Sequence, residues 1–346
     1  RRQRQMCIRD RRFIDNSKRE NYLFNSSING VEEADFILLI GTNPRFEATM
    51  LNARIRKAFV NNKTKIISLN DVGELTYDYE SLDGKTQTIK DIIDNNHKIS
   101  TEIINSKNPM IILGESFQKL KSADYLFYCL KEFLFKNNKY TTDWNPLNLI
   151  SADASTVGNL DLDLIDESNS LLDDLNKNKF EIIFLLGQDN LDFKKKDEFI
   201  IYQGSHGDRG AEIADLILPG AAFTEQSGHY TNLEGKIQKA YKASYPPGDA
   251  KEDWQIINDL AEIMNKRKLF NDKDELESSM FNYLKIKKDK QSLDIGHKKN
   301  VDNFVDEVLK IDFKDYYFSN VVARSSKTML ECNNSKLDFK KTGTEG

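Results

Sequence analysis

The segment Gly41–Arg45, with the sequence GTNPR, has the residue types of an anion-binding turn. It follows an apolar run, Phe36–Ile40, and precedes a stretch with helical spacing, Phe46–Val60. A junction of this kind exposes backbone N–H groups at the positive end of a helix dipole, and Arg45 could add a charge-assisted contact. The pattern is neither GxGxxG nor a Walker loop, so an ordinary turn with Pro44 in the first helical turn stays open as the alternative.

A second group of polar residues lies further along the chain. Two short apolar runs, Phe199–Tyr202 and Ala214–Leu218, each lead into a glycine loop. Parallel sheets form ligand-binding crevices from such loops at their carboxyl edges. Downstream, LEGKIQ places Glu234, Lys236 and Gln238 at alternate positions, with a glycine that suggests a tight turn. On a strand these three side chains would share one face, which would either line the crevice or face solvent.

Neither the histidines nor the acidic residues form a recognised metal-ligand spacing. Only an aspartate lies near His206, so we expect His206 and His229 to make polar contacts in loops. A cluster of carboxylates in LDLDLIDESN is more typical of solvated faces and helix starts than of a cation site. Its members are Asp161, Asp163, Asp166 and Glu167.

The three cysteines, Cys7, Cys129 and Cys332, include no CxxC pair. This pattern excludes a disulfide framework and a self-contained zinc or iron–sulphur site within this chain. A reduced, intracellular protein is the simplest interpretation. The apolar neighbours of Cys129 predict that it is a small core residue.

Composition indicates a folded protein that is unsuited to nucleic acid. The 346 residues are 39% hydrophobic and 30% charged, with a net charge of −5. Residues 1–12 carry six arginines and one aspartate, a contribution of +5, so the remainder is at −10. An acidic chain is a poor partner for phosphate backbones. Residues 1–12 resemble a translated adapter rather than protein, so we expect a non-native leader that replaces the true N-terminus.

Apolar runs of strand length alternate with helical spacing from residue 35 onward. This pattern predicts an α/β fold of mostly parallel sheet or sheets with helices on both faces. The expected strands are Phe36–Ile40, Lys65–Leu69, Met110–Leu113, Glu181–Leu186, Phe199–Tyr202 and Ala214–Leu218. The expected helices are Phe46–Val60, Ile89–His97, Ser116–Phe135, Ile165–Lys177 and one after Pro246-Pro247-Gly248, capped by Asp249 or a neighbouring acidic residue.

Polar stretches and apolar runs also suggest how the chain is divided. Thr141–Gly158 is expected to be a surface loop. We predict an α/β domain at 13–265, a helical extension at 266–332 and a disordered tail at 333–346. No run approaches the roughly eighteen apolar residues that a bilayer-spanning helix needs.

Four segments together resemble one family. They are IGTNPRFEATMLNARIRKAF (Ile40–Phe59), IIYQGSHGDRGAEIADLILPGAAFTEQSGHYTNLEGKIQKA (Ile200–Ala240), PPGDAKEDWQIINDLAEI (Pro246–Ile263) and DYYFSNVVARSSKTMLEC (Asp315–Cys332). In this order they are similar to the large iron–sulphur subunit of respiratory complex I, the proton-pumping NADH:quinone oxidoreductase. The part around ADLILPGAAFTEQ also fits the wider molybdopterin oxidoreductase superfamily.

The resemblance implies a molybdopterin-oxidoreductase α/β domain without the cluster-bearing region of the family, which carries [2Fe–2S] and [4Fe–4S] clusters. It implies that molybdopterin is absent, and that Gly41, Thr42, Asn43 and Arg45, with Glu234, Lys236 and Gln238, are vestiges of a cofactor site. Lys236 stands where the family usually has arginine; lysine gives a point charge instead of a two-bond fork, which favours an empty site.

Three functions follow as hypotheses. The first is a non-catalytic scaffold of complex I that binds other hydrophilic-arm subunits and the cluster-bearing region, on the cytoplasmic face of a bacterial inner membrane or the matrix side of a mitochondrial one. The second is part of an active molybdopterin enzyme, such as a formate dehydrogenase relative. The third is a small-molecule-binding α/β module, which the extended matches disfavour.

Overall fold

The computed structural model describes residues 13–151, 153–154, 156–164, 171–188, 194–207, 209–289, 304–311, 318 and 320–341. The expected leader at 1–12 lies outside this part of the chain. Two compact units are present. The first comprises residues 1–169, 230–238 and 286–313, and the second comprises 170–229, 239–285 and 314–346. The domain boundaries expected from the sequence stay a prediction.

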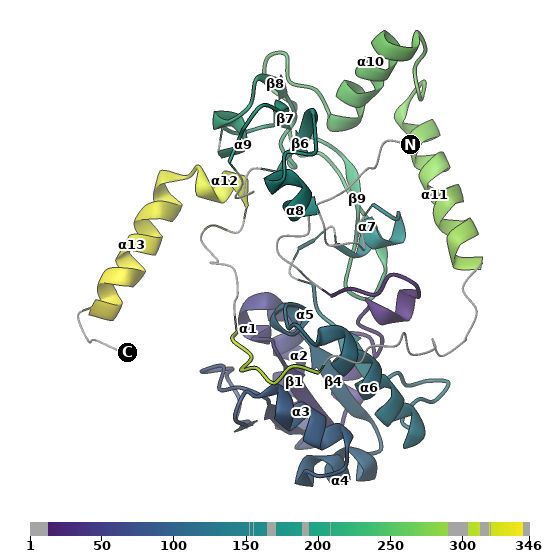
Figure 1. Cartoon of the computed structure of the whole chain (residues 1–346), viewed down its shortest axis with the longest axis vertical. Coiled ribbons are helices and arrows are strands. Elements are labelled where there is room, and N and C mark those ends of the chain that lie inside the picture. The colour runs from purple at the N-terminus through teal and green to yellow at the C-terminus, as the bar shows by residue number, and fades with distance from the viewer. Residues whose placement is uncertain are drawn as a thin grey trace. The chain divides into compact units, whose positions relative to one another are not determined.

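The first unit is built on a five-stranded sheet in the order β3-β2-β1-β4-β5. Two of its strands, β1 and β4, are labelled in Figure 1. Every neighbouring pair is parallel. The strands are β1 (Phe36–Ile40), β2 (Lys65–Ser68), β3 (Glu80–Ser81), β4 (Pro109–Leu113) and β5 (Leu147–Leu149). A parallel sheet with helices, as the α/β prediction requires, is confirmed.

Residues alternate between the two faces of β1, and each face packs into its own core. Leu38 and Ile40 point toward one layer of helices: α3 (Thr86–Ile93), α4 (Lys98–Asn105) and α6 (Ala123–Lys136). Ile37 and Leu39 pack instead against α2 (Thr49–Asn62). All five residues of β1 are almost completely buried. Both faces of a parallel sheet must be covered, which explains why this strand is continuously apolar.

Several local expectations in this unit are wrong. Ser116–Phe135 is not one helix but α5 (Glu115–Gln118) and α6, because the residues between them bind a distant segment: the Lys121 N–H donates to Glu307 Oε1 at 2.7 Å. Thr141–Gly158 is not only a loop, since it contains β5 and the beginning of α7 (Thr156–Asp161). The polar residue Asn148 interrupts the apolar pattern of β5, so the sequence does not predict this strand. Asn148 is buried, and its Oδ1 accepts from the Ser26 N–H at 2.8 Å.

The helix expected at Ile89–His97 is also different from the observed one. α3 ends at Ile93, and a separate helix, α4, begins at Lys98. His97 is the N-cap of α4, and its ring nitrogen accepts from the Ile99 N–H at 3.3 Å. The histidine therefore starts one helix rather than ending another.

The second unit contains a three-stranded parallel sheet in the order β6-β7-β8. Its strands are β6 (Ile182–Leu186), β7 (Phe199–Gly204) and β8 (Leu216–Pro219), with the short helices α8 (Leu171–Asn176) and α9 (Arg209–Glu212). β6 lies where a buried strand was expected, but Ile182 is 62% exposed and Leu186 is 55% exposed. Residues 165–170 of the helix expected at Ile165–Lys177 lie outside the described residues.

The C-terminal half adds a hairpin and longer helices. β9 (Gly228–Thr231) and β10 (Ile237–Ala240) form a two-stranded sheet. α10 (Asp253–Asn265) begins with a capping box at Glu252, an acidic neighbour of Asp249, as expected. The remaining helices are α11 (Lys273–Asp289), α12 (Val321–Arg324) and α13 (Lys327–Lys341); α13 enters the stretch 333–346, for which the sequence predicts a disordered tail.

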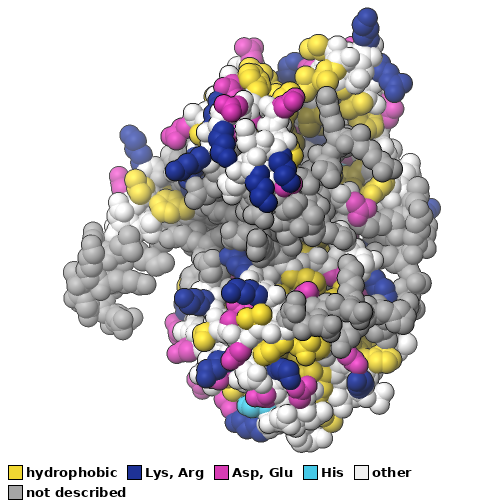
Figure 2. All heavy atoms as spheres, in the orientation of Figure 1, with side chains coloured by type: hydrophobic (Ala, Val, Ile, Leu, Met, Phe, Trp, Pro, Cys, Tyr) yellow, Lys and Arg dark blue, Asp and Glu magenta, His cyan; other side chains and the backbone are white. Residues whose placement is uncertain are grey.

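The surface seen in Figure 2 carries basic and acidic side chains interspersed with apolar ones. This mixture is typical of a solvated surface, and the basic side chains coloured in that view form no continuous field. Among the helices that the structure describes, none combines the length and the apolar character that crossing a membrane would require.

Candidate functional site

The order of strands in the first unit marks one place as the candidate site. From β1 the chain moves to β2 and β3 on one side, and then returns to β4 on the other side of β1. Open α/β sheets bind ligands outside the carboxyl ends of their strands at such a switch point. Here the loops that leave β1 and β4 are Gly41–Asn43 and Gly114, and each leads into a short helix, α1 (Pro44–Glu47) or α5.

The two loops are in direct backbone contact. The Ser116 N–H donates to the Gly41 carbonyl at 3.1 Å. A Cβ on Gly114 would lie 2.3 Å from the Gly41 carbonyl oxygen and 2.4 Å from the Thr42 Cβ. Gly41 itself has a φ of +68°, and a Cβ there would lie 2.4 Å from the Phe117 nitrogen. Both positions therefore need glycine, because the two loops pack directly against each other.

The polar side chains of the β1 loop are satisfied within the protein. Thr42 is 0% exposed and donates its hydroxyl proton to Glu47 Oε2 at 2.8 Å. The Asn43 N–H approaches Glu47 Oε1 at 3.3 Å, and the Asn43 amide donates to the Val72 carbonyl at 2.8 Å. Asn43 Oδ1 caps α1 by accepting from the Arg45 N–H at 3.0 Å. Glu47 thus holds the loop that the sequence indicated as an anion-binding turn.

Glu47 and Glu115 bring two carboxyl groups to this place. Glu115 is 4% exposed, and its backbone N–H also donates to the Glu47 carboxyl group. Burial and, to a smaller extent, the nearby charge of Glu115 raise the pKa of Glu47, and the hydrogen bonds from Thr42 and Asn43 lower it, with a net pKa of about 7. A carboxyl group with such a pKa exchanges its proton near neutrality.

Arg45 does not point its charge at the switch point. Its Nη1 donates to Glu74 Oε2 at 2.6 Å and to the Glu74 carbonyl at 2.9 Å. Glu74 belongs to the segment that follows β2. The arginine that could have bound a phosphate is therefore engaged by a carboxylate of the same unit.

The other predicted vestigial residues lie in and beside the turn between β9 and β10. Glu234 Oε1 accepts from the Ile28 N–H at 2.6 Å, and buried Gly235, with a φ of +77°, accepts from Arg19 at 2.6 Å. The glycine makes the tight turn that was expected. Lys236 and Gln238 are exposed. Glu234 is consequently a contact of Ile28, and because Glu234 and Lys236 precede β10, the three side chains do not form one strand face.

Asp161, from the acidic cluster, is a buried partner of Arg19 instead of a solvated residue. Its carboxylate accepts from Arg19 Nε at 2.9 Å and Nη2 at 3.0 Å, and from the Tyr22 hydroxyl at 2.7 Å. Asp161 is 3% exposed. Burial, followed by the bond to Asp161, raises the pKa of Tyr22, so its hydroxyl stays a donor. Asp166 and Glu167 lie outside the described residues.

The carboxyl edge of the second sheet is bridged by hydrogen bonds within this unit. The Gly220 N–H donates to the Gly204 carbonyl at 3.0 Å, which joins the two predicted glycine loops. Asp253, the first residue of α10, accepts from Gln203 Nε2 at 2.8 Å and from Gln226 Nε2 at 2.9 Å. This carboxylate lies at the edge where the sequence predicts a crevice.

His206 makes a polar contact in a loop, as predicted, whereas His229 lies in strand β9 and contacts the distant helix α11. His206 Nδ1 lies 2.9 Å from Ser205 Oγ. The ring of His229 packs edge-on against Phe281, with centroids 5.2 Å apart, and lies 3.9 Å from Glu277. Cys129 is buried, as expected. Within the part of the chain that the structure describes, no three histidine, cysteine or acidic side chains are grouped as metal ligands.

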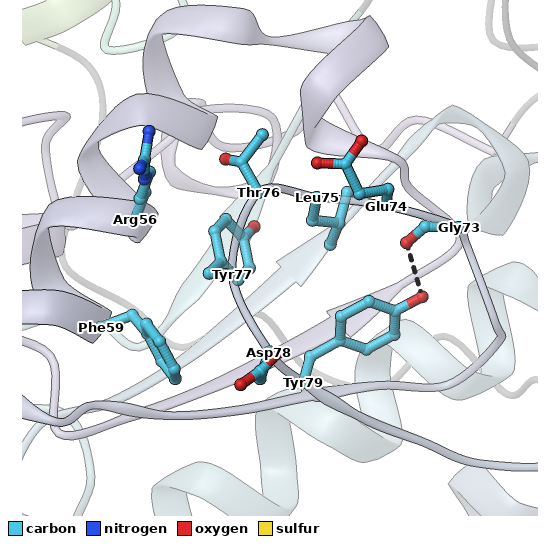
Figure 3. Close-up of a pocket in the computed structure, with 9 residues that line it drawn as sticks. All are labelled: Arg56, Phe59, Gly73, Glu74, Leu75, Thr76, Tyr77, Asp78 and Tyr79. Carbon is cyan, nitrogen blue, oxygen red and sulfur yellow. Dashed lines mark hydrogen bonds between the residues drawn. The ribbon is translucent and has the colours of Figure 1, made fainter. Parts of the chain in front are cut away.

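An open hollow of about 750 Å³ lies elsewhere on the first unit (Figure 3). Arg56 and Phe59 project from α2 on one side, and the segment Gly73–Tyr79 forms the other. The Tyr79 hydroxyl donates to the Gly73 carbonyl at 2.9 Å, which closes the segment on itself. The lining mixes one cation, two carboxylates and aromatic rings, and these residues include no nucleophile paired with a base.

Sequence reasoning missed Glu47 and Glu115, the two acidic residues whose carboxyl groups lie close together at this site. Their positions offered one weak signal: each lies in the first turns after an apolar strand. Acidic residues are ordinary there because they complement the helix dipole. Their convergence depends on the pairing of β1 with β4, which local sequence does not reveal.

Comparison with known proteins places this geometry in context. The molybdopterin oxidoreductase family matches residues 3–263, and a family of C-terminal regions from a subunit of NADH-ubiquinone oxidoreductase matches 275–332. The 78 kDa subunit of mitochondrial NADH-ubiquinone oxidoreductase from Candida albicans is 37% identical over 91% of this chain and 45% of its own length. The 75 kDa subunit from Reclinomonas americana is 34% identical over 91% of this chain and 47% of its own.

The chain thus spans about half the length of the curated relatives it matches. The predicted resemblance to the large subunit of complex I and to the molybdopterin oxidoreductase fold is confirmed. A solved formyltransferase/hydrolase complex from Methylorubrum extorquens aligns over 66% of this chain and 74% of its own, with a TM-score of 0.46 at 12% identity, a likeness too slight to add to the assignment.

Proposed function

We propose that this chain, which belongs to the molybdopterin oxidoreductase family, is a non-catalytic scaffold region of the large iron–sulphur subunit of NADH–ubiquinone oxidoreductase. The observation that carries the non-catalytic part is the backbone contact between the β1 and β4 loops at the switch point. A site that performs chemistry needs room for a reacting group beside its polar residues.

The residues at the switch point do not fit a phosphate-bearing pterin cofactor. Such a group carries negative charge and requires free donors and open space. Here Glu47 accepts from Thr42, Asn43 and Glu115, whose carboxyl group is the second at this place, and Gly114 is in contact with Gly41. We therefore derive no step through molybdopterin, and treat Gly41, Thr42, Asn43 and Arg45 as structural residues.

The activity of the complex belongs to this proposal and not to the chain alone. The relatives are named for NADH-ubiquinone oxidoreductase, in which electrons pass from NADH to a quinone. In our proposal the [2Fe–2S] and [4Fe–4S] clusters reside outside this chain, whose three cysteines include no ligand spacing for a cluster. Its partners are the cluster-bearing region and the other hydrophilic-arm subunits, on the matrix side or the bacterial cytoplasmic face.

Exposed apolar side chains on the second unit support a scaffold role. Ile263 is 80% exposed and Met264 is 63% exposed on α10, and Ile182 and Leu186 are exposed on β6. Apolar side chains left in water on a helix and an edge strand are typical of surfaces that associate.

Elemental analysis of the full-length subunit, purified from its native host, tests the proposal. We expect iron without molybdenum or tungsten, and no pterin fluorescence after denaturation. Stoichiometric molybdenum with pterin would refute the scaffold and favour the alternative, an active molybdopterin enzyme, to which the family match over residues 3–263 also points.

A further inference from the structure

The Glu47 carboxyl group is the point at which the two loops of the switch point meet. Donors reach it from the Thr42 hydroxyl and the Asn43 N–H on the loop after β1, and from the Glu115 N–H after β4. Convergent backbone N–H groups from neighbouring loops are the arrangement with which proteins hold anions. In this chain the anion is a side chain of the protein.

We propose that Glu47 is a built-in anion that closes the switch point between β1 and β4 against external anions such as phosphate. The proposal rests on the non-catalytic function and gives its physical cause. In this role Glu47 prevents external anions from binding to the donors of the two loops.

Two features of the site reinforce the exclusion. An incoming phosphate would have to displace a tethered carboxylate whose effective concentration is high because it is five residues from Thr42 and four from Asn43. It would then lie beside Glu115, which is 4% exposed, so like charges would meet with little water between them.

Arg45, a cation next to the β1 loop, is directed away from these charges. Arg45 is bound by Glu74 at 2.6 Å, on the segment after β2. Glu115 is the charged neighbour of the Glu47 carboxyl group, and Thr42 and Asn43 are its donors from the β1 loop. Even the protonated form of Glu47 keeps its place in the loop, because a carboxylic acid still has oxygens that accept from the Asn43 N–H.

This role is tested by measuring the binding of inorganic phosphate to the purified chain with isothermal titration calorimetry. Wild type and the conservative variant Glu47→Gln, which keeps an acceptor in place, should show no saturable binding. Glu47→Ala should free the donors and show saturable phosphate binding, with an affinity at least about tenfold above the detection limit that wild type does not reach. The matched control Glu132→Ala removes an exposed carboxylate from α6 and should behave as wild type.

Amide resonances of the unaltered chain supply a second measurement if Glu47→Ala does not fold. The Asn43 and Glu115 amide signals should stay in place on addition of phosphate at constant pH. Shifts of these two signals in wild type would overturn the proposal, as would a folded Glu47→Ala that gains no phosphate binding.

The two proposals fail separately. Phosphate binding by wild type would refute the role of Glu47 and leave membership of the complex intact. Molybdenum in the native subunit would refute the scaffold function, whatever phosphate does in this chain.

Discussion

Replacing Glu47 with Gln should remove a pH dependence from the stability of the first unit. Burial, with Glu115 nearby, raises the pKa of Glu47 from 4.5 to about 7. The native state therefore binds more protons than the unfolded state between these two values. The free energy of unfolding of wild type should fall as the pH rises through this window, because the folded protein must then hold an ionised carboxylate.

The size of this change in the free energy of unfolding follows from the shift in the pKa of Glu47. A change of about 2.5 pKa units corresponds to an upper limit of roughly 3 kcal/mol. Because Glu47 is only half-buried, we expect about 1–3 kcal/mol after partial solvent screening. Glu47→Gln should match wild type near pH 4.5, where Glu47 is neutral, and exceed its stability by this amount near pH 8.

Urea unfolding at pH 4.5, 6 and 8 measures the difference. Trp144 is 6% exposed within the first unit, so its fluorescence reports on that unit once Trp254 is replaced by Phe. Glu132→Gln, at an exposed ion pair with Lys136, is the matched control and should show a difference below about 0.5 kcal/mol. A Glu47→Gln variant that is equally destabilised at all three pH values would contradict the reasoning.

Three further substitutions test other contacts. Asp161→Asn should lower the free energy of unfolding by about 3 kcal/mol, because it leaves the half-buried charge of Arg19 without its bidentate partner. An unchanged midpoint of denaturant unfolding would contradict this expectation. Gly114→Ala should lower the free energy of unfolding by about 1–3 kcal/mol, because its added Cβ clashes with the β1 loop. Gly207→Ala is the control: nothing lies within 4 Å of its added Cβ, so its melting temperature should be nearly that of wild type. Glu252→Ala should lower the protection of the first α10 amides against hydrogen exchange by about 1 kcal/mol, and full protection in the variant would show that the capping box is dispensable.

The sequence was sufficient for those elements whose pattern is local. Phe36–Ile40 is a continuous apolar run ended by glycine, and the strand has the same bounds. An acidic cap before Trp254 was expected, and Glu252 supplies it. Errors occurred where distant contacts override local pattern, as at β5, where buried Asn148 made a strand look like a loop.

The family and the parallel α/β architecture could be predicted from the sequence alone, because long motifs and strand-length apolar runs consist of consecutive residues. The grouping of polar side chains at the candidate site depends on the tertiary structure. Thr42 and Glu115 are far apart in the chain, and they meet at Glu47 because β4 pairs with β1. Whether a glycine loop holds a ligand or a carboxylate of its own protein depends on that pairing, since hydrogen bonds and charges act through space and not along the chain.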